Sequence, residues 1–117
     1  MSDLSPEDHA DFADAVAAVR KEFHEGLPGR VDTLESMLEV LSGGFDRAAA
    51  ETFYRQSHSL KGTAGSFGAL ELVEPAASMS EMGRSWLKVG TASAAELSRA
   101  EGELERLRAA VIAYLEG

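Results

Sequence analysis

The chain has 117 residues, enough for one small hydrophobic core, and we expect residues 1–117 to form a single domain. Hydrophobic residues make up 44% of the sequence and aromatic residues only 7%, which favours packed helices over a β-sandwich. The formal net charge of −9 argues against nucleic acid and anionic membranes as partners. The absence of cysteine excludes disulfides and thiolate metal sites and agrees with a reducing compartment.

The sequence shows no targeting signal and no membrane-spanning segment. The start Met1-Ser2-Asp3 is acidic and polar, without the basic and apolar regions of a signal peptide. No apolar run approaches the roughly 18 residues that a spanning helix requires. We therefore expect a cytoplasmic protein.

The first part of the chain predicts two helices that are separated near Gly26. Ser5 is a good N-cap and Pro6 suits the first helical position of a helix that should end near Gly26. Pro28 fits the first turn of a second helix, which Gly43-Gly44 should close. The apolar positions are Phe12, Val16, Val19 and Phe23 in the first helix and Leu27, Val31, Leu34, Leu38 and Leu41 in the second.

Two further helices are predicted between residues 46 and 87. Asp46 is a good N-cap for a long helix that should stop around Phe67-Gly68, where glycine suits the position after a helix end. The next helix should run from about Ala69 to Leu87. It contains Pro75, which indicates either a kink or a later start, nearer Glu74.

The last helix is predicted from Ser93 to the C-terminus. Ser93-Ala94-Ala95-Glu96 is a capping box, and apolar residues continue at alternating spacings of three and four. No strand pattern is present. The sequence therefore predicts an all-α fold, an up-down-up-down four-helix bundle with an additional N-terminal helix laid against it.

The segment from His58 to Gly68 carries the strongest functional signal. On a helix that turns by about 100° per residue, Phe53, Leu60 and Phe67 fall on one face, which should be buried. His58 falls on the opposite face and should point to solvent. The residues that lie within about 60° of it are Tyr54, Lys61, Gly62 and Gly65.

The two glycines on this exposed face indicate that a partner approaches His58 closely. Each mid-helix glycine costs about 1 kcal/mol relative to alanine, and packing gives no return on an exposed face. A neutral imidazole has a free lone pair at pH 7 and is a plausible nucleophile. Lys61, one turn beyond His58, could place its ammonium group near an oxygen of a bound phosphoryl group.

This segment resembles the signature of histidine-containing phosphotransfer (HPt) domains, the phosphohistidine carriers of two-component phosphorelays. The resemblance is carried by His58-x-Leu60-Lys61-Gly62-x-Ala64-x-x-Phe67-Gly68. It implies that His58 accepts a phosphoryl group from a phospho-aspartate on a receiver domain and passes it to another receiver. It also implies that Lys61 helps to neutralise the phosphoryl group and that Gly62 leaves room for the receiver.

The implied partners are receiver domains of response regulators or of hybrid histidine kinases. We expect Tyr54, Gly62, Gly65 and Ser66 to form the part of the docking surface that lies on the same helix. The sequence has no ATP-binding loop, so we expect a phosphocarrier and not an enzyme. We expect no metal site and no cofactor, with Mg²⁺ on the receiver only, and a monomeric protein.

Two other classes of function remain open at this point. The module also resembles the phosphoacceptor part of a chemotaxis-type histidine kinase, in which other domains carry out the ATP chemistry. Alternatively, the protein is a helical scaffold that binds a partner through an exposed face and is never phosphorylated. An acid-labile phosphoryl group, gained from a charged receiver, would distinguish a carrier from a scaffold.

Overall fold

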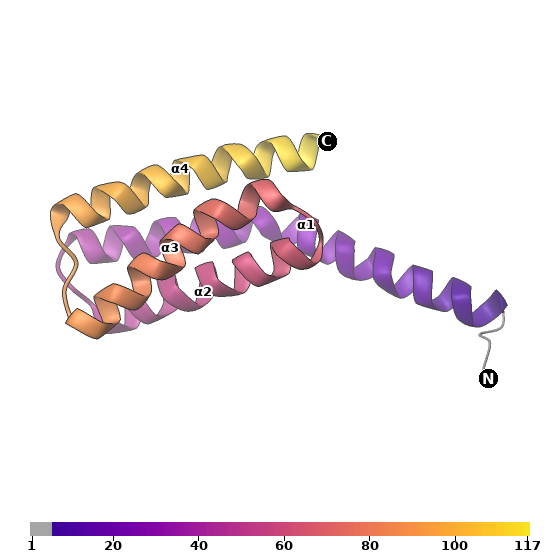
Figure 1. The fold of residues 1–117 in the computed structure, drawn as a ribbon, viewed down its shortest axis with the longest axis horizontal. Helices are drawn as coiled ribbons and strands as arrows, with labels where there is room; N and C mark the ends of the chain where they lie inside the picture. Colours follow the sequence, from indigo (N-terminus) through magenta and orange to yellow (C-terminus); the bar gives the residue numbers. More distant parts are fainter. Residues whose placement is uncertain (1–5) are drawn as a thin grey trace.

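Four α-helices make up the bundle in the computed structural model, which describes residues 6–117, with side chains from residue 11 onward (Figure 1). They are α1 (Pro6–Ser42), α2 (Arg47–Ser66), α3 (Leu70–Val89) and α4 (Ala94–Glu116). Successive helices run in opposite directions and pack on one another, and α4 returns to pack on α1. The described residues contain no strand. The predicted all-α class and four-helix arrangement are confirmed.

The predicted separate N-terminal helix is wrong, because α1 passes through Gly26 and Pro28 without a break. It contains 37 residues and is therefore about 55 Å long. Proline inside a helix costs about 3 kcal/mol, but the apolar stripe of α1 stays in phase across this point, and its burial outweighs that cost. The buried stripe consists of Phe23, Leu27, Val31, Leu34, Leu38 and Leu41. The predicted N-cap Ser5 lies outside the described residues.

The predicted helix ends at Asp46, Gly68 and Ser93 are confirmed by their cap geometry, whereas α3, predicted to end at about Leu87, continues to Val89. The Asp46 carboxylate accepts a hydrogen bond from the N–H of Ala49 at 2.9 Å, and Gly68 after α2 has a φ of +72°. In the capping box, the Ser93 hydroxyl accepts from the N–H of Glu96 at 3.1 Å, and the Glu96 carboxylate accepts from the N–H of Ser93 at 2.9 Å. These hydrogen bonds lower the pKa of Glu96 below its ordinary value.

The alternative start of α3 near Glu74 is wrong, since the helix begins at Leu70 and includes Pro75. Leu72 and Ala76 are fully buried on the same side as Pro75, which is itself buried. Core packing therefore stabilises the start of α3, although Pro75 has no N–H to donate to the helix.

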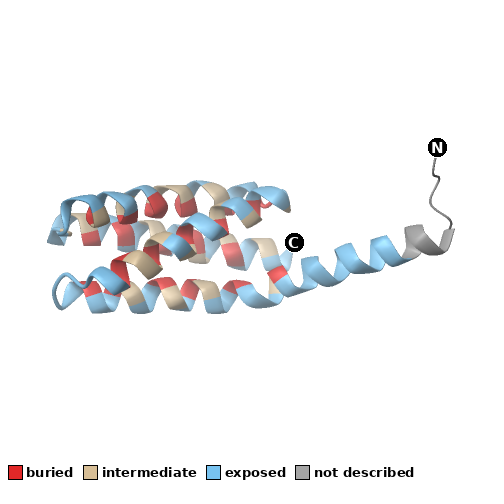
Figure 2. Cartoon of the chain, turned by 90° about the horizontal axis from the view of Figure 1, so that it is seen from below, coloured by how far each residue is buried: buried red, intermediate tan, exposed pale blue. Residues whose placement is uncertain are grey.

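The core lies along the inner sides of the four helices, where buried residues line the bundle (Figure 2). Between α2 and α3, the rings of Phe53 and Trp86 are stacked with centroids 5.3 Å apart. The part of α1 before the bundle extends beyond its end, and residues 11–22 are exposed along their whole length (Figures 1 and 2). Among the described helices, none combines the length and the apolar character needed to cross a membrane.

Candidate functional site

His58 lies in the middle of α2 and is exposed to solvent, as the helical wheel predicts. Phe53 and Leu60 anchor the opposite side of α2 in the core, where both are fully buried. The buried face also includes Ser57, whose hydroxyl donates to the carbonyl of Phe53 at 2.7 Å. The buried face of α2 is therefore rotated somewhat towards Ser57, relative to the buried face that the helical wheel predicts. This rotation leaves His58 well outside the core.

Tyr54 and Lys61 lie one turn before and one turn after His58 and are both half-buried. The Tyr54 ring is stacked on the His58 ring, with centroids 5.7 Å apart and planes 26° from parallel. Lys61 takes part in none of the ion pairs found among the described residues. An aromatic residue in contact with the imidazole and a lysine thus lie on the turns before and after His58.

Gly62, Gly65 and Ser66 are exposed beyond His58 towards the end of α2. A Cβ atom added to Gly62 or Gly65 would meet no heavy atom within 4 Å, so neither glycine is needed for packing within this chain. The Ser66 hydroxyl donates to the carbonyl of Gly62 at 3.1 Å and lies close to the helix. The surface at Gly62 and Gly65, between His58 and the end of α2, therefore carries no bulky side chain of its own.

Gly83 on α3 contributes to the site and was missed in the sequence interpretation. A Cβ atom at this position would lie 3.1 Å from both Cα and Cβ of Tyr54 and 3.2 Å from Cδ1 of Phe53. The buried glycine thus allows α3 to approach the backbone of α2 at the residue that stacks on His58. A glycine inside a helical pattern is the sequence signal that could have indicated this close approach.

Replacing Gly83 by alanine is expected to destabilise the fold. The added methyl group forces α2 and α3 apart, and such overpacking costs about 1–3 kcal/mol, more than the roughly 1 kcal/mol that alanine gains in helix propensity. Urea denaturation measures the change in the free energy of unfolding. The matched control is Gly102→Ala on α4, where a Cβ atom meets nothing within 4 Å and a small stabilisation is expected. Equal stabilisation of both variants would contradict the close approach.

The site residues predicted from the sequence therefore share one stretch of α2. Tyr54, His58 and Lys61 are neighbours on successive turns, and Gly62, Gly65 and Ser66 continue the same surface. Within the part of the chain that the structure describes, no group of three or more histidine, aspartate and glutamate residues is placed to hold a metal ion. The arrangement offers one exposed nucleophile and one nearby cation.

Comparison with known families shows the family to which the chain belongs. A model of the Hpt domain matches residues 18–110, which include most of the bundle and all of the predicted site residues. The protein belongs to the Hpt domain family. Domains of this family carry phosphoryl groups in two-component relays, interact with receiver domains and have no ATP site of their own. No curated protein and no solved structure matches the chain.

Proposed function

We propose that this protein is a phosphorelay carrier that accepts a phosphoryl group on His58 from one receiver domain and transfers it to another. The observation that carries the proposal is the exposed imidazole beside two glycines, Gly62 and Gly65, that have no packing role within the chain. Family membership supports phosphotransfer as the reaction. The clear surface supports close approach by a folded partner, because a receiver must bring its aspartate to the imidazole.

In the proposed reaction, the neutral imidazole of His58 attacks the phosphorus of a receiver phospho-aspartate. The new N–P bond forms as the acyl P–O bond breaks, and the electron pair of that bond leaves on the aspartate carboxylate. The reverse reaction with a second receiver restores the free histidine. The stacked Tyr54 ring restricts rotation of the imidazole and so helps to hold it for in-line attack. The receiver supplies the divalent cation, and the carrier needs no cofactor of its own.

Lys61 is proposed to stabilise negative charge on the phosphoryl oxygens. Replacing it by methionine keeps an unbranched side chain of nearly the same length but removes the charge, and we expect transfer to slow by about tenfold or more. The measurement is the rate of phosphoryl transfer from a labelled receiver. The matched control is Lys88→Met at the end of α3, an exposed lysine outside the site, which should transfer at the normal rate. If both variants transfer equally fast, the proposed role of Lys61 is refuted.

The proposed partners are receiver domains of response regulators or of hybrid histidine kinases in the cytoplasm. Tyr54, Gly62, Gly65 and Ser66 form the part of the docking surface on α2. A transient signalling contact of this kind should be small and exchange rapidly.

Intact-mass spectrometry at neutral pH tests the proposal. The protein is mixed with a phosphorylated receiver, and the expected result is a gain of one acid-labile phosphoryl group. Adding a second, unphosphorylated receiver should then remove the group from the carrier. Failure to gain mass with several receivers would favour a scaffold that is not phosphorylated.

A further inference from the structure

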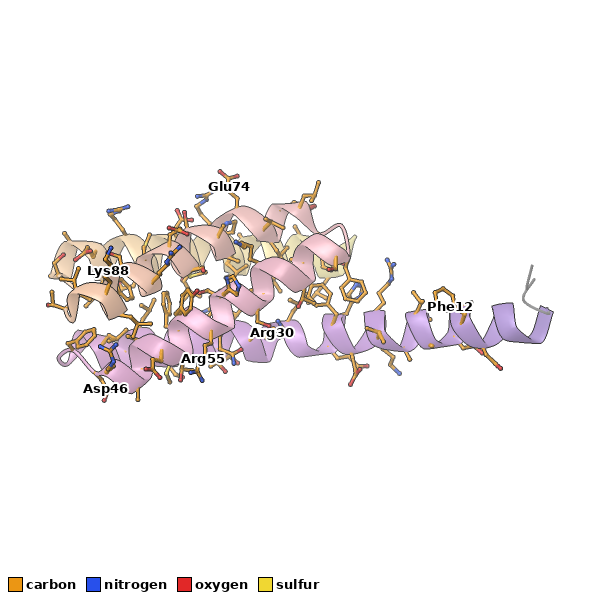
Figure 3. The ribbon with its side chains drawn as sticks, turned by 60° about the horizontal axis from the view of Figure 1, so that its bottom comes forward. Phe12, Arg30, Asp46, Arg55, Glu74 and Lys88 are labelled. Carbon is orange, nitrogen blue, oxygen red and sulfur yellow. The ribbon has the colours of Figure 1, made fainter. Side chains whose placement is uncertain are left out.

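Arg55 is a second basic residue next to His58, on the side of the imidazole away from Lys61. It precedes His58 by three residues, as Lys61 follows it by three, so both are neighbours of the histidine on the surface of α2. On a helix that turns by about 100° per residue, the two lie about 60° to either side of His58. Lys61 is half-buried, whereas the Arg55 side chain is 77% exposed (Figure 3). The proposed reaction uses Lys61 and gives no role to Arg55.

The helix that carries His58 keeps a positive charge in a chain that is strongly acidic. Of the four described helices, α2 is the one in which basic residues outnumber acidic ones, three to one, whereas α1 contains three basic and nine acidic residues. The carboxylate of α2, that of Glu51, lies 3.8 Å from Arg47 and 3.9 Å from Arg55. One carboxylate cannot neutralise two guanidinium groups, and such exposed ion pairs are weak. Arg55 thus retains positive charge for a partner.

A folded partner that reaches His58 also covers Arg55. Residues three apart on a helix have Cβ atoms about 5–6 Å from each other. Even a small transient interface covers a patch more than about 20 Å across on each protein. A covered guanidinium group without a partner costs free energy, because it loses its contact with water. The docked protein must therefore place an acceptor opposite Arg55, and a carboxylate is the best one.

We propose that Arg55 is a specificity residue of the docking surface and that it pairs with a carboxylate on the docked receiver. This inference rests on the proposed docking of a receiver at His58. The receiver supplies the divalent cation, and such ions are held mainly by carboxylates, so acidic side chains are expected around its phospho-aspartate. A receiver with a carboxylate opposite Arg55 gains a charge-assisted pair, whereas one with a neutral or basic residue there leaves the guanidinium group unpaired.

The distribution of charge also favours one orientation of the partner. An acidic receiver is repelled by the carboxylates of α1 and attracted by the basic residues of α2. Such long-range forces act mainly on association and are screened by salt. Arg55 therefore acts on the encounter and on the choice of receiver, and Lys61 acts on the reacting group.

Binding of a receiver domain that carries beryllofluoride on its aspartate, a stable mimic of the phosphoryl group, tests the proposal by isothermal titration calorimetry. At low salt, Arg55→Gln should raise the dissociation constant about threefold to tenfold and weaken its dependence on salt. Arg55→Lys keeps the charge and should recover most of this loss. The matched control is Arg99→Gln, an exposed position on α4, the helix diagonally opposite α2, which should bind normally. Circular dichroism checks that all variants keep their helical content.

Transfer kinetics separate docking from the reaction itself. When the concentration of phosphorylated receiver is varied, Arg55→Gln should raise the half-saturating concentration and leave the maximal rate within about twofold of the unmodified protein. Lys61→Met should instead lower the maximal rate. An equal loss of maximal rate in both variants would assign Arg55 to the reacting phosphoryl group and overturn its role in docking.

Double-mutant cycles identify the carboxylate on the receiver. Each exposed carboxylate near the phospho-aspartate is replaced by the corresponding amide and combined with Arg55→Gln. One of these pairs should be coupled by about threefold or more in the dissociation constant. The absence of coupling with all of them would overturn the proposed pair.

The binding test is independent of phosphoryl transfer, because it is repeated in a His58→Gln background. If no protein acquires a phosphoryl group but Arg55→Gln still binds more weakly than Arg99→Gln, the carrier proposal fails and the docking role of Arg55 stands. If transfer proceeds and the two arginine variants bind equally tightly at low salt, the docking role is overturned and the carrier proposal stands.

Discussion

The variant His58→Gln is expected to gain no phosphoryl group from a charged receiver. Glutamine has no nucleophilic ring nitrogen, so the N–P bond cannot form, and the loss should be complete. The side chain is exposed and glutamine is a good helix former, so the free energy of unfolding should change by no more than about 0.5 kcal/mol. Intact-mass spectrometry before and after acid treatment measures the phosphoryl group, and urea denaturation measures stability.

His24 provides a matched control for this experiment. It is half-buried, and its Nε2 lies 3.0 Å from the Tyr114 hydroxyl, so it is poorly placed to attack a receiver. The variant His24→Gln should therefore still acquire the phosphoryl group. Phosphorylation that persists in His58→Gln but disappears in His24→Gln would move the carrier to the other histidine.

The variant Gly62→Gln is expected to slow transfer by about tenfold to a hundredfold without harming the fold. A glutamine at this position points into open space in the free protein but occupies the surface that the receiver must approach. Loss of close contact at the reacting atoms carries a large penalty in rate, because attack requires a separation of about 3–3.5 Å. The free energy of unfolding should rise by up to about 1 kcal/mol through helix propensity.

The variant Gly102→Gln is the matched control. It separates the loss of space for the receiver beside His58 from the general effect of replacing an exposed glycine in a helix. Gly102 lies on α4, which is diagonally opposite α2 in the bundle, and a Cβ atom there also meets nothing within 4 Å. We expect the same small gain in stability and an unchanged transfer rate. If Gly62→Gln transfers the phosphoryl group as fast as Gly102→Gln, then Gly62 is not needed to leave space for the receiver.

Local sequence signals were sufficient for much of the fold and for the exposure of the site. Asp46 and the capping box at Ser93 act within one helical turn, so their effect is visible without knowledge of the tertiary structure. The exposed position of His58 follows from periodicity within α2 alone. The roles assigned to Lys61 and to the docking residues stay predictions that the experiments above address.

Features that depend on contacts between helices could not be predicted in the same way. The continuity of α1 through Pro28 results from burial of a stripe that is in phase on both sides, which local propensity does not include. Gly83 acquires its role only because Tyr54, nearly thirty residues earlier in the sequence, lies against it in the fold. The same holds for burial of Ser57, which turns α2 slightly away from the orientation predicted by the wheel.

The two parts of α1 before and after Pro28 differ in their resistance to local unfolding, although the helix is continuous. Because proline has no N–H, the carbonyl of His24 loses its usual donor, and the backbone ladder lacks one bond at this point. Residues 11–22 contribute no buried side chain, so these turns can open locally without disturbing the core. Amide hydrogen exchange should therefore be fast in the projecting segment and slow after Pro28.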